Sequence, residues 1–261
     1  MIPKKIHYCW FGGGSLPELA QKCIKSWKKY CPDYEIIEWN ESNFDVTLTP
    51  FMKEAYESKA WAFVSDYARL KIIHENGGFY LDTDVELVKS LDLLCENKCY
   101  FGIERDSAVI ATGLGFGAEK GNDIIFEMMK EYDNVIFSKE NMTEIACPIF
   151  NTRVLEKRGF VRENRYQVLG DVVVYPPEYF DPISPWIKTN LVCKETISVH
   201  HYNASWNQEE KDKKQIFQKV HKLLPFGLAK MVSALLAAFK NGGLENVYKK
   251  FKKKLNKGKQ N

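Results

Sequence analysis

The chain has 261 residues, of which 45% are hydrophobic and 13% are aromatic. This composition is sufficient for a buried core and excludes a wholly disordered chain. The net charge of +3 conceals an asymmetry, because residues 248–261 contain seven lysines and no acidic residue, which leaves 30 basic against 34 acidic residues in residues 1–247. A mildly acidic body gives no indication of nucleic-acid binding, whereas the basic tail suits an anionic surface.

The apolar segments and the cysteines bear on where the protein works. Residues 1–7 lack the apolar stretch of a signal peptide, and no uninterrupted apolar run approaches the ~18 residues typical of a membrane span. The seven cysteines are scattered without CxxC spacing, which is typical of reduced thiols. We therefore expect a cytoplasmic core.

Strands and helices alternate along the first part of the chain. The sequence predicts, in chain order, a strand over 6–11, a helix over 17–30, a strand over 34–39, a helix over 62–75 and a strand over 79–81. The helix that precedes the last strand ends at Asn76-Gly77-Gly78, a strong C-terminal signal. Further on we expect strands at 100–104, 168–175 and 196–201, a helix at 122–132, and helices from 209 to the end.

This alternation indicates an α/β fold with a Rossmann-like, mostly parallel sheet flanked by helices. We expect one large domain over residues 1–208 and a helical, basic, amphipathic appendage over 209–261. Ligands of such sheets bind beyond the carboxyl ends of the strands. Both Trp10-Phe11-Gly12-Gly13 and Asp82-Thr83-Asp84 fall at such ends, which makes them the first candidates for a site.

Asp82 and Asp84 are the strongest candidates. In extended backbone, residues two apart project from the same face, so the two carboxylates would repel unless a cation lay beside them. Hard divalent cations such as Mn²⁺ or Mg²⁺ prefer such oxygen ligands and bridge to phosphates. The alternative is a solvated Asp-x-Asp turn, but the preceding Gly-Gly-Phe-Tyr-Leu run favours a buried strand just before it.

Other polar side chains are weaker candidates when taken singly. Asp66 and Arg69 share a helical face and could grip sugar hydroxyls, or form an ordinary surface ion pair. Trp10 could stack on a base, or pack in the core. His200 and His201 leave a strand on opposite faces, so one of them could be a metal ligand, or both could be structural.

Together these elements resemble the glycosyltransferases of family 32, which contain a DXD sugar-binding region. The stretch Ser65-Asp66-Tyr67-Ala68-Arg69-Leu70, followed by Gly77 to Asp84, carries the resemblance. Ile6 to Gly13 and His200 to Trp206 are similar to the family in the expected order. The family includes yeast mannosyltransferases and bacterial capsule-synthesis enzymes, and the glucosylating domains of clostridial toxins contain a related block.

The resemblance implies a GT-A fold and retaining, metal-dependent transfer of a hexose from a nucleotide sugar, with UDP-hexose as the first expectation and GDP-mannose as the second. It implies that Asp84 binds Mn²⁺ or Mg²⁺ and that Asp82 contacts the ribose and reaches the metal through water. The remaining implied donor contacts are Ser65, Asp66, Arg69 and Tyr80, with Trp10 at the base and Ser205 and Trp206 at the diphosphate. His200 is the implied late metal ligand, with His201 as the alternative.

The tail has two apolar helical stripes. The first comprises Leu228, Met231, Val232, Leu235 and Phe239, and the second comprises Leu244, Val247, Tyr248, Phe251 and Leu255, with lysines beside it. They could pack on the domain or anchor the protein on an anionic membrane. We expect the second, a peripheral position on the inner face of the cell membrane, where an enzyme of capsular polysaccharide biosynthesis would meet a glycan or lipid-linked acceptor.

Two other functions fit parts of the sequence. Leu81-Asp82-Thr83-Asp84-Val85 matches the nucleophile motif of haloacid dehalogenase-type phosphatases, although the motif lies late in the chain and leaves Asp66 and Arg69 without a role. A non-catalytic scaffold, tethered at a membrane by its lysines, would not need both aspartates.

Overall fold

The computed structural model describes residues 1–139, 141–142, 144–184, 186, 190–203, 208–245 and 248. The chain forms two compact units, one comprising Met1–Ser184 and Thr189–His201 and the other Pro185–Lys188 and Tyr202–Asn261. Each unit is considered by itself.

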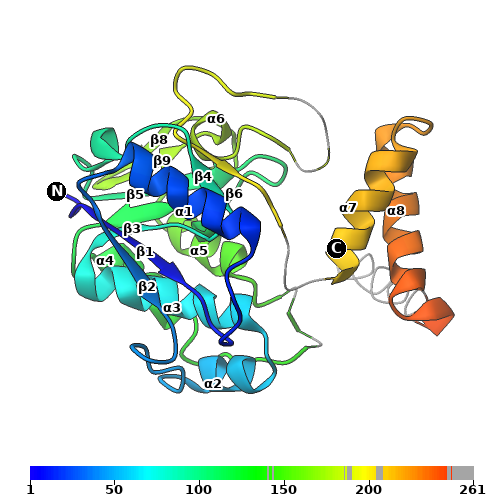
Figure 1. Cartoon of the computed structure of the whole chain (residues 1–261), viewed down its shortest axis with the longest axis horizontal. Coiled ribbons are helices and arrows are strands. Elements are labelled where there is room, and N and C mark those ends of the chain that lie inside the picture. Colours follow the sequence, from blue (N-terminus) through cyan, green and yellow to red (C-terminus); the bar gives the residue numbers. More distant parts are fainter. Residues whose placement is uncertain are drawn as a thin grey trace. The chain divides into compact units, whose positions relative to one another are not determined.

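The first unit is built on an eight-stranded sheet (Figure 1). The strand order is β2-β1-β3-β7-β5-β9-β8, and β6 pairs with β5. The strands are β1 (Lys5–Cys9), β2 (Glu35–Trp39), β3 (Gly78–Tyr80), β5 (Cys99–Glu104), β6 (Val109–Ile110), β7 (Phe116–Ala118), β8 (Gln167–Leu169) and β9 (Val172–Tyr175).

Most of these strands run in one direction. β2, β1 and β3 are parallel, β7 is antiparallel to both of its neighbours, and β5 and β9 are again parallel to each other. Because β7 is antiparallel to both β3 and β5, β5 runs in the same direction as β3, and so does β9. The carboxyl ends of β1, β3, β5 and β9 therefore lie at one edge of the sheet, and the predicted α/β class with a mostly parallel sheet is confirmed.

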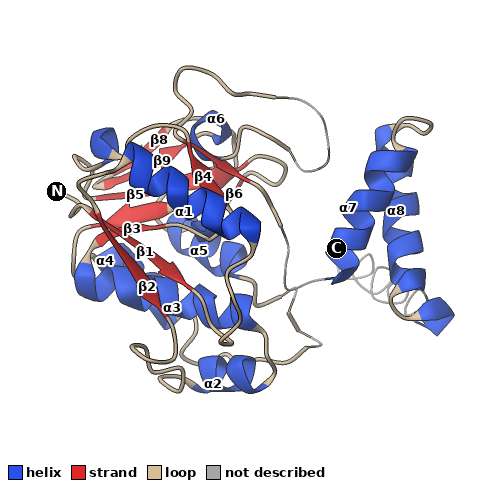
Figure 2. Cartoon of the chain, in the orientation of Figure 1, coloured by secondary structure: helices blue, strands red, loops and turns tan. Residues whose placement is uncertain are grey.

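Helices cover both faces of this sheet (Figure 2). On one face, Trp27 is fully buried and packs edge-on against Tyr8. On the other face, helices pack with Cys9, Phe101 and Phe116 in the main hydrophobic core. The helices are α1 (Glu18–Tyr30), α2 (Pro50–Glu57), α3 (Trp61–Asn76), α4 (Asp123–Lys130), α5 (Cys147–Glu156) and α6 (Pro177–Phe180), with short 3₁₀ turns η1 (Asp92–Leu94) and η2 (Thr112–Leu114).

The sequence prediction of one strand over residues 168–175 is wrong. Gly170 adopts φ +62°, and the segment forms the antiparallel hairpin β8–β9 instead. A positive φ is accessible to glycine without the steric penalty that other residues meet, so the chain reverses there.

A separate two-stranded sheet joins distant parts of the first unit. β4 (Val85–Leu87) pairs antiparallel with β10 (Ser198–His200), with His200 opposite Val85. The indole nitrogen of Trp27, on α1, donates to the carbonyl oxygen of Val85 at 2.8 Å, which fixes β4 against that helix.

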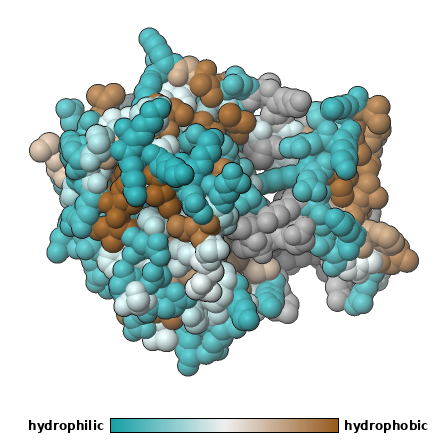
Figure 3. Space-filling model, viewed as in Figure 1, coloured by the Kyte–Doolittle hydropathy of each residue, from teal (hydrophilic) through white to brown (hydrophobic). Residues whose placement is uncertain are grey.

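The second unit contains the helical hairpin of α7 (Gln208–Val220) and α8 (Phe226–Lys240). The side chain of Asp212 accepts hydrogen bonds from Lys240 Nζ at 2.6 Å and from Asn241 Nδ2 at 2.9 Å, which joins the start of α7 to the end of α8. Large apolar side chains of α8 are exposed (Figure 3). Among the described residues, no helix combines the length and the apolar character that a membrane span requires.

Candidate active site

The junction of α3 and β3 delivers the acidic motif to the edge of the sheet. Gly77 ends α3 with φ +65° and donates its N–H to the Ile73 carbonyl oxygen. Gly78 has φ +105°, and a Cβ there would lie 2.8 Å from the Lys5 carbonyl oxygen. The two glycines therefore allow the chain to turn sharply after α3 and let β3 pack closely beside β1. The Asn76-Gly77-Gly78 signal predicts this helix end.

Asp82 and Asp84 lie in a tight turn rather than in extended backbone. The N–H of Val85 donates to the carbonyl oxygen of Asp82 at 2.9 Å, which closes a four-residue turn between β3 and β4. The prediction that the two carboxylates share a face because of strand alternation is therefore wrong in its geometry. The turn nevertheless brings both carboxylates to the same place, at the carboxyl end of β3.

His200 is the histidine that meets the motif. Its Nε2 lies 3.1 Å from Asp84 Oδ1, while the backbone N–H of His201 donates to the Asp84 carbonyl oxygen at 3.0 Å. The His201 ring faces the other way, with Nε2 at 2.9 Å from Glu86 Oε2, and Lys22 Nζ contacts the same oxygen at 2.8 Å. The register of β4 and β10 thus places His200, and not His201, beside the two aspartates.

These three side chains could hold a divalent cation. One ligand atom from each of Asp82, Asp84 and His200 lies within 4.8 Å of the others. Two ligands on opposite sides of an ion at about 2.1 Å are themselves about 4.2 Å apart, so small adjustments would complete the site. The two carboxylates suit Mn²⁺ or Mg²⁺, whereas an imidazole ligand favours a transition metal such as Mn²⁺ over Mg²⁺.

The electrostatics of the cluster favour a positive partner. Burial raises the pKa of Asp82, and the nearby carboxylate of Asp84 raises it further, although Arg69 opposes both effects. Burial opposes protonation of His200, but the carboxylates of Asp84 and Asp82 outweigh it and raise the pKa of the imidazole. Each shift has the sign expected where negative charge is concentrated in a poorly solvated place.

Arg69 links the acidic motif to α3. Its Nη2 lies 3.1 Å from Asp66 Oδ1 and 3.4 Å from Asp82 Oδ1, and its Nε donates to the Ser65 carbonyl oxygen at 3.0 Å. The guanidinium is only 4% exposed and lies over the ring of Tyr80, whose hydroxyl donates to Asp82 Oδ1 at 3.1 Å. The alternative of a surface ion pair between Asp66 and Arg69 is therefore wrong.

Asp66 is held in a fixed position by its surroundings. Its side chain is buried, and loss of hydration raises the pKa of the carboxyl to about 6, while Arg69 and hydrogen bonds from Cys147, at the start of α5, lower it. A carboxylate at a helix N-terminus is favoured by the helix dipole. Asp66 can therefore orient Arg69 toward Asp82.

Gly113, in η2, is a site residue that the sequence argument did not single out. A Cβ at this position would lie 2.5 Å from Asp82 Oδ2 and 3.4 Å from Arg69 Nη1. Only a residue without a side chain allows the loop to approach the carboxylate so closely. The glycine-rich spacing of Gly113, Gly115 and Gly117 was the available signal.

The remaining predicted donor contacts are Trp10, Ser65, Ser205 and Trp206. Trp10 follows β1 and is half-buried, with its indole N–H donating to the Gly14 carbonyl oxygen. The hydroxyl of Ser65 donates to the Trp61 carbonyl oxygen at 3.0 Å, within its own helix. Ser205 and Trp206 lie outside the described residues.

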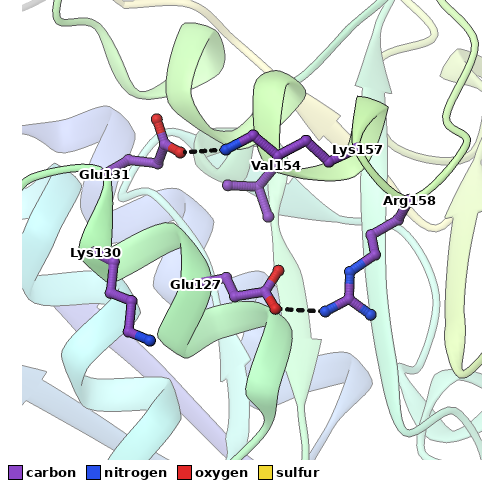
Figure 4. A pocket seen from close by; sticks show the side chains of 6 residues that line it. All are labelled: Glu127, Lys130, Glu131, Val154, Lys157 and Arg158. Carbon is purple, nitrogen blue, oxygen red and sulfur yellow. Dashed lines mark hydrogen bonds and ion pairs between the residues drawn. The ribbon is translucent and has the colours of Figure 1, made fainter.

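A hollow between α4 and α5 is a separate feature (Figure 4). Charged side chains line it, and four of them form two pairs: Lys157 Nζ lies 3.0 Å from Glu131 Oε1, and Arg158 contacts Glu127. None of the aspartates of the acidic motif contributes to its lining. The hollow therefore offers no alternative centre for the chemistry of Asp82 and Asp84.

Comparison with known families bears directly on the acidic motif. Residues 17–101 match the family model described as glycosyltransferase sugar-binding region containing DXD motif. These residues are therefore similar to a glycosyltransferase sugar-binding region. The region spans α3, β3 and the Asp82–Asp84 turn, so the resemblance based on Ser65 to Asp84 is confirmed. Trp10 and His200 lie outside the matched residues.

Individual proteins show more distant similarity to this glycosyltransferase region. Inositol phosphoceramide mannosyltransferase 3 of Schizosaccharomyces pombe is 28% identical over 141 residues, which are 52% of this chain and 39% of that protein. The chain thus spans about two fifths of this curated relative. The structure of PaToxG glycosyltransferase aligns with a TM-score of 0.49 and 20% identity over 60% of this chain and 69% of that one. The ligand-free glycosyltransferase domain from the YGT toxin aligns with a TM-score of 0.46 and 11% identity over 92% and 96%.

Proposed function

We propose that the protein is a retaining, metal-dependent hexosyltransferase that uses a nucleotide sugar. The observation that carries this proposal is the cluster of Asp82, Asp84 and His200 within a glycosyltransferase sugar-binding region. Three ligands of this type would leave positions on a hard cation for the oxygens of a nucleotide diphosphate. Mn²⁺ is the first metal to test and Mg²⁺ the second.

The charge of the leaving nucleotide diphosphate gives these residues a role in the proposed reaction. When the anomeric C–O bond breaks, negative charge develops on the nucleotide diphosphate, and a bound Mn²⁺ or Mg²⁺ ion supplies the Lewis acidity that stabilises this charge. Asp82, Asp84 and His200 would hold the ion. Arg69, fixed by Asp66, presents a permanent positive charge beside Asp82 and suits contact with the donor.

Retention of configuration is the stereochemical part of the proposal. A covalent route requires a carboxylate free to attack the anomeric carbon. The buried Asp66 carboxylate is instead paired with Arg69, and Asp82 accepts a hydrogen bond from Tyr80. These contacts favour front-face attack by the acceptor, assisted by the leaving phosphate, in which neither aspartate forms a bond to the sugar.

We propose UDP-hexose as the first donor to test and GDP-mannose as the second. The mannosyltransferase name of the yeast relative supports the inclusion of GDP-mannose. The proposed acceptor is a glycan or lipid-linked oligosaccharide of surface polysaccharide synthesis, such as a capsule. The proposed location is the inner face of the cell membrane, which the lysine-rich tail supports through its charge. Trp10 is proposed to contact the base, and Ser65 and Tyr80 the remainder of the nucleotide sugar.

The test is a donor screen with purified full-length protein. Slow hydrolysis of UDP-glucose, UDP-galactose or GDP-mannose should require Mn²⁺ or Mg²⁺ and should stop on addition of EDTA. Proton NMR of the first sugar released should show the α-anomer from an α-linked donor, since the proposed mechanism retains configuration. Metal-independent hydrolysis of p-nitrophenyl phosphate without turnover of any sugar donor would instead support the phosphatase.

A further inference from the structure

The two faces of α8 differ in the size of their side chains. Ala229, Ser233 and Ala237 recur at every fourth position and are fully buried. Residues spaced by four lie on one side of a helix, so this row faces α7. Small side chains there let the two helices approach closely. The exposed large apolar residues of α8 are therefore outside this buried row.

Those large residues form an outward stripe. The side chains of Leu228, Met231, Leu236 and Phe239 are 42%, 50%, 48% and 55% exposed. At about 100° per residue Leu228, Met231 and Phe239 fall on the side of α8 away from the buried row, and Leu236 lies at the margin between that side and Ala229. Figure 3 shows this apolar strip along α8. Of the stripe predicted from the sequence, Leu228, Met231 and Phe239 project outward in the described structure, whereas Val232 and Leu235 are half-buried.

The charge of the second unit restricts what can cover the stripe. α8 contains no acidic residue, and Lys219, Lys222 and Lys230 are exposed on the hairpin. Residues 202–261 contain 14 lysines and four acidic residues, a net charge of +10. An apolar strip within strongly basic surroundings suits a surface that is both apolar and anionic.

We propose that the outward stripe of α8, defined by Leu228, Met231, Leu236 and Phe239, inserts into the interfacial region of an anionic lipid bilayer. The 15 residues of α8 are about 22 Å long, shorter than the ~30 Å hydrocarbon core, so the helix lies along the surface. The inference rests on the proposed location of the enzyme and adds the face that contacts lipid. Lysines around the hairpin contact the anionic headgroups.

A second copy of the chain fits this surface less well. Pairing two stripes would bring together two units of net charge +10, and the repulsion would oppose association. A bilayer containing anionic lipid has the opposite charge and satisfies both properties of the face. Charge complementarity therefore selects the membrane.

The test is sedimentation of the full-length protein with vesicles of phosphatidylcholine alone or with 30% phosphatidylglycerol. The wild type should bind the anionic vesicles at least tenfold more tightly. The triple variant Leu228→Gln/Met231→Gln/Phe239→Gln, which keeps charge and helix propensity, should bind them at least tenfold more weakly than the wild type. Metal-dependent hydrolysis of the donor should be unchanged, so loss of lipid binding is separable from loss of catalysis.

The matched control replaces three exposed apolar side chains of the first unit by glutamine. Leu93, Ile136 and Val168 are exposed there, and the variant Leu93→Gln/Ile136→Gln/Val168→Gln should bind vesicles like the wild type. Equal binding of the α8 variant and the wild type would overturn the proposal and would assign vesicle binding to the lysines alone. A second outcome would also overturn the proposal: the wild type is a dimer that does not bind vesicles, and the α8 variant is a monomer. That result would assign the face to a second copy of the chain.

Discussion

His200 Nε2 lies 3.1 Å from Asp84 Oδ1, although 116 positions separate the two residues in the chain. The contact depends on pairing of β4 with β10, which sets His200 opposite Val85. A short motif thus acquires its third candidate ligand from a distant strand. The consequences can be measured residue by residue.

Asp84→Asn should lower turnover of the nucleotide sugar by about 10²-fold or more, because an amide oxygen carries no full charge with which to hold the proposed cation. Steady-state kinetics with saturating donor would measure the loss. The matched control is Asp171→Asn, since that carboxylate is exposed and pairs with Lys98 at 2.9 Å. A near-normal rate for Asp84→Asn would refute the assignment of this residue to the metal.

The two adjacent histidines should differ sharply. His200→Asn should raise the Mn²⁺ concentration needed for half-maximal activity by about tenfold or more, because it removes a candidate ligand. His201→Asn should change it within about threefold, since His201 pairs with Glu86 in a partly exposed position. Titration of each variant with Mn²⁺ compares them directly. Equal effects would mean that the register of β4 and β10 does not select the ligand.

Gly113→Ala should lower activity by about 10²-fold while leaving the fold intact. The added Cβ would lie 2.5 Å from Asp82 Oδ2, so either the loop or the carboxylate must shift, and small displacements in a catalytic site are costly. The control is Gly227→Ala, where a Cβ meets nothing within 4 Å. Donor kinetics and circular dichroism of both variants provide the measurement. Full activity of Gly113→Ala would show that the loop yields without affecting Asp82.

His7 should make stability depend on pH. It is fully buried, and Trp39 Nε1 donates to its Nδ1 while its Nε2 contacts the Gly77 carbonyl oxygen. Burial lowers the pKa of His7 from 6.5 to about 4. The unfolded chain therefore takes up the proton first, and about 3 kcal/mol of stability, complete above pH 6.5, is lost as the pH falls to about 4.

Urea unfolding of the wild type and of His7→Asn between pH 4 and pH 7 tests this expectation. The variant should be less stable at pH 7, where the wild type keeps its two hydrogen bonds. The difference in unfolding free energy between the two proteins should shrink as the pH falls, since the variant has no imidazole to protonate. A constant difference would show that His7 does not titrate with folding.

Local signals in the sequence predicted the long helices of the first unit well. α1 follows from apolar periodicity, and the end of α3 follows from Gly77. α2 was not predicted because it is only eight residues long, although Thr49 caps it with its hydroxyl and Pro50 begins it. These two residues were a usable start signal.

Contacts between residues that are distant in the sequence could not be predicted from the spacing of residue types. Asp82 and Asp84 were predicted as a pair, but their turn and the ion pair between Arg69 and Asp82 depend on how α3 packs beside β3. The choice between His200 and His201 depends on strand register, which no local pattern encodes. Gly113 belongs to the site because of a single close approach to Asp82.

The separation of Asp84 from His200 also has a consequence during synthesis. A ribosome adds about 5–20 residues per second, so the imidazole follows the carboxylates after an interval on the order of ten seconds. During that interval the nascent chain has two acidic groups and no histidine to complete the cluster. Translation products that stop before β10 therefore lack the third candidate ligand, and the fraction of chains that bind a cation with full affinity should report how much of a preparation was translated past this strand.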